Sequence, residues 1–337
     1  MRRASVILTI VTALTATIAT AALALAIGPR PITTATRHTG DPALAAILAE
    51  HAPPGSRNIS AFTIRDGQAT FAGLGSDEHT EFEIGSITKT FTAELLTRAV
   101  ERQELTLDTT VGEIIETTGA EITDVTLKEL ATHTSGLPRL AKMGLPQFFA
   151  SVTGGNPYAD HTREELLDAA RDASLTDRGE VAYSNFGFAL LGQLIAEATD
   201  TPYPTLIKDE ILTPLGMEDT YLMTPGSVPD HAPRGLTTAG RASSPWEMDA
   251  DAPAGALRST AQDMAIWADH VLASPLPEYT WFHDTGATVF HNGGTGGFMS
   301  MLLVDAATDT AAFAITDTNA GMEDLGRTLL DHAREGA

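Results

Sequence analysis

The chain has 337 residues, no cysteine and a formal net charge of −23. Without cysteine it can form neither a disulfide nor a thiolate metal site, and no pattern in the sequence indicates a metal or a cofactor. So acidic a surface disfavours nucleic acid and anionic lipid as partners, and we take a monomer as the default state. The length and a hydrophobic content of 43% allow one large domain or two lobes.

The first residues have the pattern of an export signal. Arg2 and Arg3 precede the uncharged run 4–27, which has small residues near its end. As a helix this run would extend about 36 Å, enough to cross a bilayer. The sequence therefore leaves two alternatives for residues 1–27, a cleaved signal peptide or a membrane anchor. Both place the rest of the chain outside the cytoplasm. Residues 28–40, rich in Pro, Thr and Arg, are expected to be a linker.

A single domain is expected over residues 41–337. It begins at Asp41-Pro42, which has the N-cap and first-turn residue types of a helix. Segment 59–65 alternates apolar and polar residues, and 68–73 returns after Asp66-Gly67. This dipeptide is a strong signal for a two-residue hairpin turn, so a hairpin is predicted here.

The middle of the chain has mostly helical patterns. Thr126 and Glu129 have the spacing of a capping box, and segment 185–198 is a strongly apolar helix. Segment 139–160 is punctuated by Gly and Pro, which predicts a long loop of the kind that borders a cleft.

Strand patterns return near the C-terminus, at 288–291, 299–304 and 311–315, before a last helix at 326–333. This order predicts an α+β fold, with an antiparallel sheet formed by both chain ends and flanked by helices. A mostly helical lobe is expected to be inserted at approximately 105–240. The candidate active cleft then lies between the sheet and the lobe.

The first candidate site residues are Ser86 and Lys89, at the start of a helical pattern that follows Gly85. Residues three apart share a helix face, and a helix N-terminus supplies unpaired N–H groups. A hydroxyl, a nearby amine and such donors are what a serine nucleophile needs. Since serine is also a common helix cap, this pair alone is a weak signal.

Two more segments bear similar residue types. Tyr183 and Asn185 point the same way in an extended segment, and a phenol near an ammonium ionises more easily, so Tyr183 is a candidate base. Glycines follow His291 and Asn292, which allows a close backbone approach to a substrate. The N–H of Gly294 could then donate to an oxyanion together with that of Ser86.

Together these segments resemble the serine β-lactamase-related family, on the side that holds class C β-lactamases, D-alanyl-D-alanine carboxypeptidases and related esterases. The resemblance covers about residues 42–335, and its motifs occur in the family's order. The matching segments are Ser86-Ile87-Thr88-Lys89, Tyr183-Ser184-Asn185 and His291-Asn292-Gly293.

The resemblance implies a β-lactamase/transpeptidase-like fold and roles for the matching residues. Ser86 would form an acyl-enzyme, with Lys89 and Tyr183 handling the proton, and the sequence leaves open which of the two is the base. Substrate binding and the oxyanion site would fall to Asn185, His291, Gly293 and Gly294.

The implied substrate is a small molecule or a peptidoglycan peptide: a D-Ala-D-Ala peptide, a β-lactam or a short ester. His291 and Asn292 depart from the family's usual lysine and threonine, which favours a peptidase or esterase over a true β-lactamase. The alternative is a penicillin-binding sensor that is acylated without turnover.

Overall fold

A computed structural model describes residues 28–141 and 144–335. The alternatives of signal peptide and anchor concern residues 1–27, which lie outside the described residues. Within those residues, no helix combines the length and the apolar character that a membrane span requires.

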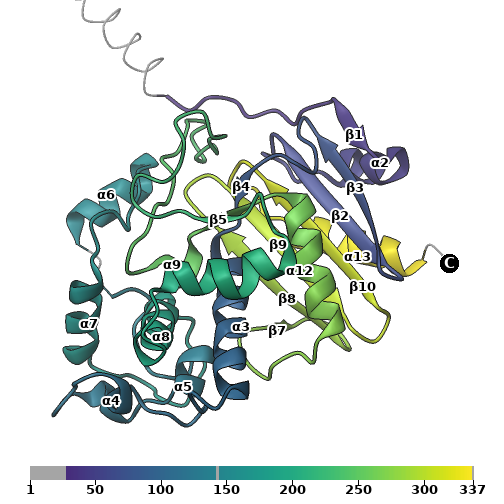
Figure 1. Cartoon of the computed structure of the whole chain (residues 1–337). Helices are drawn as coiled ribbons and strands as arrows, with labels where there is room; N and C mark the ends of the chain where they lie inside the picture. The colour runs from purple at the N-terminus through teal and green to yellow at the C-terminus, as the bar shows by residue number, and fades with distance from the viewer. Residues whose placement is uncertain (1–27, 142–143, 336–337) are drawn as a thin grey trace, which may run out of the picture.

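The core of the molecule is an antiparallel sheet with strand order β1-β3-β2-β10-β9-β8-β7 (Figure 1). Its N-terminal and C-terminal strands meet where β2 pairs with β10 along its whole length. The α+β architecture with a sheet from both chain ends therefore agrees with the sequence prediction. The strands are β1 (His38–Gly40), β2 (Ile59–Arg65), β3 (Gln68–Leu74), β7 (Phe282–His283), β8 (Thr288–Gly294), β9 (Met299–Asp305) and β10 (Thr310–Thr316).

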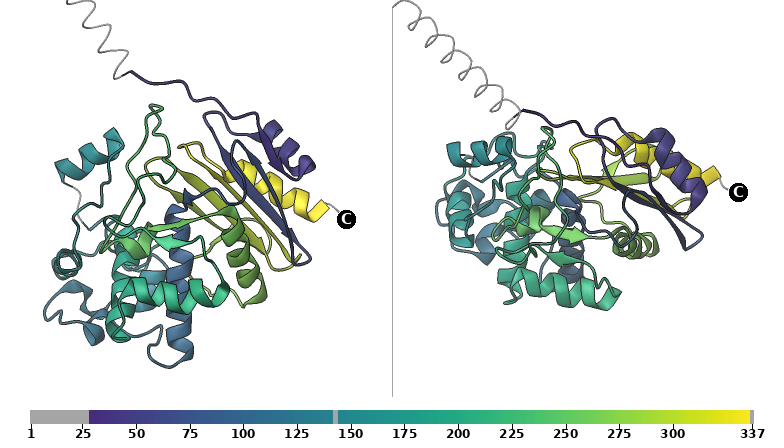
Figure 2. Two further views of the ribbon diagram at one scale, coloured as in Figure 1. Left: turned by 45° about the horizontal axis from the view of Figure 1, so that its top comes forward. Right: turned by 90° about the horizontal axis from the view of Figure 1, so that it is seen from above.

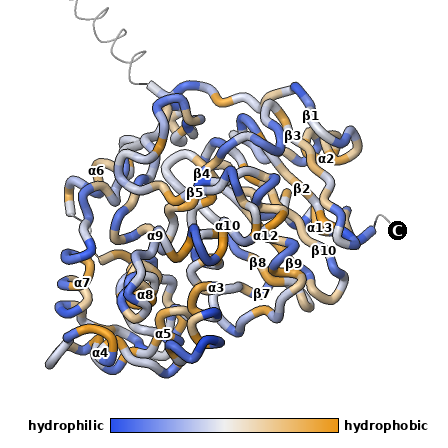
Figure 3. Tube along the Cα trace, viewed as in Figure 1, coloured by the Kyte–Doolittle hydropathy of each residue, from blue (hydrophilic) through white to orange (hydrophobic). Residues whose placement is uncertain are grey.

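Helices cover both faces of this sheet (Figure 2). Because side chains alternate along a strand, Phe313 of β10 packs toward α12 (Ala261–Ala273), whereas Ala312 packs toward α2 (Pro42–His51) and α13 (Glu323–Glu335). Apolar residues follow the inner strands and helices, and hydrophilic residues gather in outer turns (Figure 3).

The helical lobe lies beside the sheet, against α3 (Thr88–Glu101) and the 3₁₀ turn η1 (Gly85–Ile87) that precedes it. A small second sheet, in the order β4-β6-β5, lies next to η1. The remaining elements are β4 (Phe82–Glu83), α4 (Val111–Ile114), η2 (Glu121–Asp124), α5 (Leu127–Ala131), α6 (Leu145–Thr153), α7 (Arg163–Arg171), α8 (Asn185–Ala198), α9 (Tyr203–Leu206), the π-helical turn η3 (Ile207–Leu212), α10 (Thr213–Leu215), β5 (Tyr221–Leu222), α11 (Ala252–Gly255) and β6 (Leu257–Ser259).

Several local predictions are confirmed at the level of single hydrogen bonds. Asp41 caps α2 by accepting from two backbone N–H groups, and Thr126 and Glu129 form a capping box on α5. Arg65 pairs with Gln68, so Asp66-Gly67 is a two-residue hairpin turn. These features depend on neighbours in sequence, which is why the sequence predicts them well.

Two segments differ from their sequence predictions. Residues 38–40, at the end of the expected linker 28–40, form the edge strand β1 by backbone pairing with β3. Such pairing needs no apolar pattern, so the composition gave no sign of it. Segment 139–160 was expected to be a loop, but it contains α6, which starts just before a proline at its second position.

Candidate active site

The start of α3 places Ser86 and Lys89 on the same side of the helix. Gly85 has a φ of +54°, and a Cβ there would lie 2.6 Å from the backbone nitrogen of Gly294. A glycine is therefore needed both for the left-handed backbone and for the close approach of β8. The turn η1 then brings the Ser86 hydroxyl to the floor of a pocket.

Lys89 is fully buried and its amine has three neighbours. Its Nζ lies 2.8 Å from Oδ1 of Asn185, 2.6 Å from the carbonyl oxygen of Ala254 and 3.0 Å from Oγ of Ser86. Burial, followed by the charge of Arg139, holds the pKa of Lys89 well below its usual value. The amide and carbonyl oxygens can accept only, so they take two N–H donors and leave the third position of the amine facing the Ser86 hydroxyl.

Tyr183 contacts the same hydroxyl from the other side. Its phenol O–H donates to Oγ of Ser86 at 2.7 Å, and its ring lies 4.9 Å from Nζ of Lys89. Burial raises the pKa of Tyr183 to about 12, although the Ser86 hydrogen bond and the charge of Arg139 oppose the rise. The expectation that this phenol ionises easily is therefore wrong, because loss of water outweighs the nearby positive charge.

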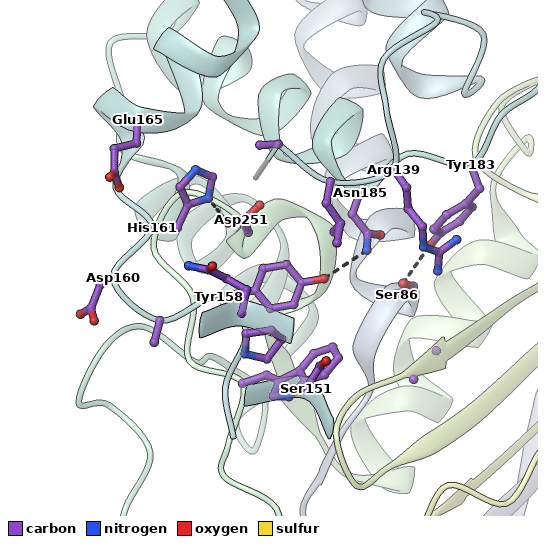
Figure 4. A pocket seen from close by; sticks show the side chains of 18 of the residues that line it. Ser86, Arg139, Ser151, Tyr158, Asp160, His161, Glu165, Tyr183, Asn185 and Asp251 are labelled. Carbon is purple, nitrogen blue, oxygen red and sulfur yellow. Dashed lines mark hydrogen bonds and ion pairs between the residues drawn. The ribbon is translucent and has the colours of Figure 1, made fainter. Parts of the chain in front are cut away.

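The N-cap of α8 is Ser184, so the Asn185 side chain is not needed as the cap and can bond other groups. Oγ of Ser184 accepts from the N–H of Gly187 at 2.9 Å. The Asn185 amide then accepts from Lys89 and donates to the Tyr158 hydroxyl at 3.2 Å (Figure 4). One side chain thus connects the buried amine to the pocket wall.

The glycine-rich end of β8 forms the opposite wall. Asn292, Gly293 and Gly294 line the pocket, and a Cβ on Gly293 would lie 1.9 Å from the carbonyl oxygen of Ile84. Because Gly293 has no side chain, the β8 backbone can lie directly against the segment that precedes Ser86. The structure therefore brings the Ser86, Tyr183 and Gly294 segments to one pocket, although they are far apart in sequence.

His291 is placed differently from the expectation that it would reach this pocket. Its side chain is fully buried and is not among the groups that line the pocket. It lies on the lobe side of β8, since the next side chain, Asn292, donates to Glu323 of α13 on the other face. Its Nδ1 donates to the carbonyl oxygen of Asn292 at 2.8 Å, and its ring packs 5.5 Å from that of Phe282. Burial is the main reason that the pKa of His291 falls to about 3.

The pocket has a volume of about 720 Å³ and includes residues that the sequence did not single out. The Arg139 guanidinium lies 5.0 Å from the centre of the Tyr183 ring, next to Ser86 (Figure 4). Farther along the wall, His161 is paired with Asp251. Arg139 belongs to segment 139–160, which the sequence predicted to border a cleft, so this segment could have pointed to it. No pattern joins His161 to Asp251, because they are separated by 90 positions and meet only in the fold.

Within the described residues, no cluster of three or more His, Asp or Glu side chains has the geometry to hold a metal ion. The polar groups around Ser86 contact each other instead, as a hydroxyl, an amine, a phenol and an amide. This set can move a proton away from a hydroxyl and return it, which is the chemistry of nucleophilic catalysis.

Comparisons with known proteins identify relatives of the chain. The family model described as Beta-lactamase matches residues 46–278. The D-alanyl-D-alanine-carboxypeptidase/endopeptidase AmpH of Escherichia coli (strain K12) is 34% identical over 199 residues, which cover 57% of this chain and 49% of that protein. A Beta-lactamase of Providencia stuartii is 28% identical over 211 residues, covering 60% and 50%. The chain thus spans about half the length of the curated relatives it matches.

Solved structures share the fold. The octameric penicillin-binding protein homologue from Pyrococcus abyssi aligns with a TM-score of 0.66 and 25% identity, over 82% of this chain and 72% of that one. A class C beta lactamase from Rhodobacter sphaeroides aligns with a TM-score of 0.67 and 21% identity, over 87% and 98%. The predicted β-lactamase/transpeptidase-like fold is therefore confirmed.

Proposed function

The chain belongs to the Beta-lactamase family, and on that premise we propose that it is a serine hydrolase that works through an acyl-enzyme on Ser86. The observation that carries this proposal is the double contact of one hydroxyl. Oγ of Ser86 accepts from the Tyr183 phenol at 2.7 Å and lies 3.0 Å from the Lys89 amine. A hydroxyl held between a donor and an amine is prepared to lose its proton to the amine as it attacks.

Lys89 is the base in this mechanism. Its lowered pKa favours the neutral amine, whose lone pair faces the Ser86 hydroxyl once its two N–H donors are taken by Asn185 and Ala254. Tyr183, with a pKa near 12, keeps its proton and acts as a donor. As Oγ bonds to the substrate carbonyl carbon, its proton moves to Lys89.

The remaining steps return that proton. The N–H groups of Ser86 and Gly294 stabilise the oxyanion. When the tetrahedral intermediate collapses, Tyr183 donates its proton to the leaving nitrogen or oxygen and regains one from protonated Lys89. Water then attacks the ester carbonyl on Ser86 and releases the acid by the same groups in reverse.

The substrate is an amide or ester whose reacting carbonyl fits beside Ser86: a D-Ala-D-Ala peptide, a β-lactam or a small ester. We also propose an extracytoplasmic location, because of the export pattern in residues 1–27. Arg139 is the cation beside Ser86 in the pocket, where it can receive a carboxylate on the substrate. The family usually has lysine and threonine where β8 of this chain bears His291 and Asn292. In this proposal Arg139 supplies the contact to a substrate carboxylate from the other wall.

A labelling and turnover experiment tests the proposal. The wild-type protein, Ser86→Ala and Ser151→Ala are treated with a fluorophosphonate and examined by mass spectrometry. Ser151 is the matched control because it also lines the pocket, and its hydroxyl donates to the Phe148 carbonyl of its own helix. We expect one adduct on the wild type and on Ser151→Ala, and none on Ser86→Ala. An adduct that persists on Ser86→Ala would remove Ser86 from its role.

Turnover separates the enzyme from a sensor. Nitrocefin, a D-Ala-D-Ala peptide and p-nitrophenyl acetate are supplied in excess to the wild-type protein and to Ser86→Ala. Steady release of product from at least one substrate, absent in Ser86→Ala, supports a hydrolase. A single burst equal to the amount of protein, with no steady phase, indicates the penicillin-binding sensor instead.

A further inference from the structure

Helix α6 has its two faces in an unusual arrangement. Its polar residues Gln147 and Ser151 line the pocket. On the other side of the helix an apolar stripe is exposed to solvent, and no residue of α6 is buried. The stripe residues and their exposed fractions are Leu145 73%, Phe148 51%, Phe149 59% and Val152 60%.

The spacing of the stripe is that of one helix face, since its residues lie at i, i+3, i+4 and i+7. In a soluble protein such a face normally packs on the core and the polar face meets water. Here the polar face is directed at the pocket and the apolar face at solvent. An exposed apolar face of this kind marks a surface that contacts something else.

The start of the described chain is connected to the same region. The N–H of Ser244 donates to the carbonyl oxygen of Gly154, directly after α6. In the same loop, the Ala239 carbonyl accepts from the N–H of Arg30, and Arg241 donates to the Gly28 carbonyl at 3.2 Å. Gly28 and α6 are therefore held by one loop. The start of the purple trace and α6 both lie toward the upper end of the molecule in Figure 1 and in both views of Figure 2.

What precedes Gly28 indicates what covers the stripe. Residues 4–27 carry no charge and are numerous enough to cross a bilayer. A chain anchored by this run would hold the loop around Gly28, and with it α6, close to the lipid surface. Residues 145–153 also carry no charged side chain, so nothing on the helix opposes contact with a zwitterionic lipid interface.

We propose that α6 is a membrane-contacting helix that lies in the plane of the bilayer interface with its apolar stripe among the lipids. The anchor would hold the chain on the membrane, and the stripe would fix the orientation of the rest of the chain against the lipid surface. The pocket-lining face of α6, opposite the stripe, then points away from the bilayer core, so the pocket lies within about one helix diameter of the membrane surface. This proposal depends on the N-terminal run remaining on the chain and is independent of the role of Ser86.

The absence of cysteine allows a direct test with single-cysteine variants. Phe149→Cys on α6 and Lys128→Cys on α5 are labelled with a polarity-sensitive fluorophore. Lys128 is exposed, and α5 lies at the opposite end of the helical lobe from α6 in Figure 1. The full chain is reconstituted in phosphatidylcholine vesicles that contain brominated lipid. We expect a blue shift and bromine quenching for the probe at 149, and neither for the probe at 128.

Other occupants of the stripe give different results, each of which overturns the proposal. A probe at 149 that stays as water-exposed as the probe at 128 shows that the membrane does not cover α6. A blue shift in detergent that grows with protein concentration indicates a second copy of the chain. A blue shift in the vesicles without bromine quenching, present in detergent at every protein concentration, indicates that α6 folds onto its own chain. A probe at Val152→Cys repeats the test at a second exposed site, and circular dichroism checks that each variant is folded.

Discussion

The two walls that flank Ser86 differ in what they contribute to the pocket. The helical wall, from α3 and α8, contributes side chains: the Lys89 amine, the Tyr183 phenol and the Asn185 amide. The sheet wall, from β8, contributes mainly backbone, because Gly293 and Gly294 have no side chain and the buried His291 is not among the groups that line the pocket.

Lys89 and His291 make this difference clear. Both are bases, both are fully buried, and burial lowers the pKa of both. Lys89 lies 3.0 Å from the Ser86 hydroxyl, whereas His291 contacts the carbonyl of its neighbour Asn292. A lowered pKa therefore does not identify a catalytic base by itself, and the connection to the reacting hydroxyl decides the role.

The largest expected effect comes from removing the amine. Lys89→Met should slow acylation of Ser86 by about 10⁴-fold, the upper range for the loss of a general base. His291→Leu should change the acylation rate far less, because the imidazole is hydrogen-bonded to the Asn292 carbonyl and does not line the pocket. Stopped-flow acylation with a chromogenic ester measures both rates. If both variants lost acylation rate to a similar extent, His291 would act on Ser86 as Lys89 does, and the proposed difference between the two walls would be wrong.

Next in size is the loss of the phenol proton. Tyr183→Phe should lower kcat by about 10²-fold, the lower range for a general acid, because the leaving group then lacks its donor. The rate of acylation by a substrate with a good leaving group, such as p-nitrophenolate, should stay nearly unchanged and serves as the internal control. Equal losses for good and poor leaving groups would argue against Tyr183 as the acid.

The pH profile of kcat/KM sharpens this assignment. Lys89 must be neutral to accept the proton, so the rate should rise through its lowered pKa and then level off. Since the pKa of Tyr183 is about 12, its ionisation adds no limb between pH 5 and 10. A rate that keeps climbing about tenfold per pH unit up to pH 10 would instead indicate tyrosinate as the base.

A paired glycine substitution tests the backbone role of β8. A Cβ at 293 would lie 1.9 Å from the Ile84 carbonyl oxygen, so Gly293→Ala should push β8 away from Ser86. We expect a loss of about 10²-fold in kcat, comparable to the loss of one oxyanion donor. In Gly294→Ala the new Cβ meets the flexible Met299 side chain at 2.8 Å, so the effect should be smaller. Steady-state kinetics compare the two, with thermal unfolding as the check on folding.

The smallest expected effect is at the pocket rim. Arg139→Gln should raise KM about tenfold for an ester that bears a carboxylate, because a charge-assisted hydrogen bond is lost. KM for neutral p-nitrophenyl acetate should stay unchanged. An equal rise for both substrates would mean that Arg139 supports the pocket wall rather than recognising charge.

Residue types and spacing were enough to find the local elements and the candidate site segments. The cap at Asp41, the turn Asp66-Gly67 and the capping box at Thr126 depend on residues within three positions of each other, so they are legible in the sequence. The Ser86 and Tyr183 motifs are weak signals one by one, and they gained weight as part of an ordered set that resembles the family's motifs.

Tertiary structure decided what each of these groups contacts. Which way His291 faces follows from the pairing of β8 with β9, and the position of Arg139 follows from packing between separate segments. The pKa values of Lys89 and Tyr183 depend on how much water the surrounding fold removes. The sequence by itself determined which reactive groups the chain carries, whereas only the fold decided which of them meet, because burial and long-range contacts arise from segments that are distant along the chain.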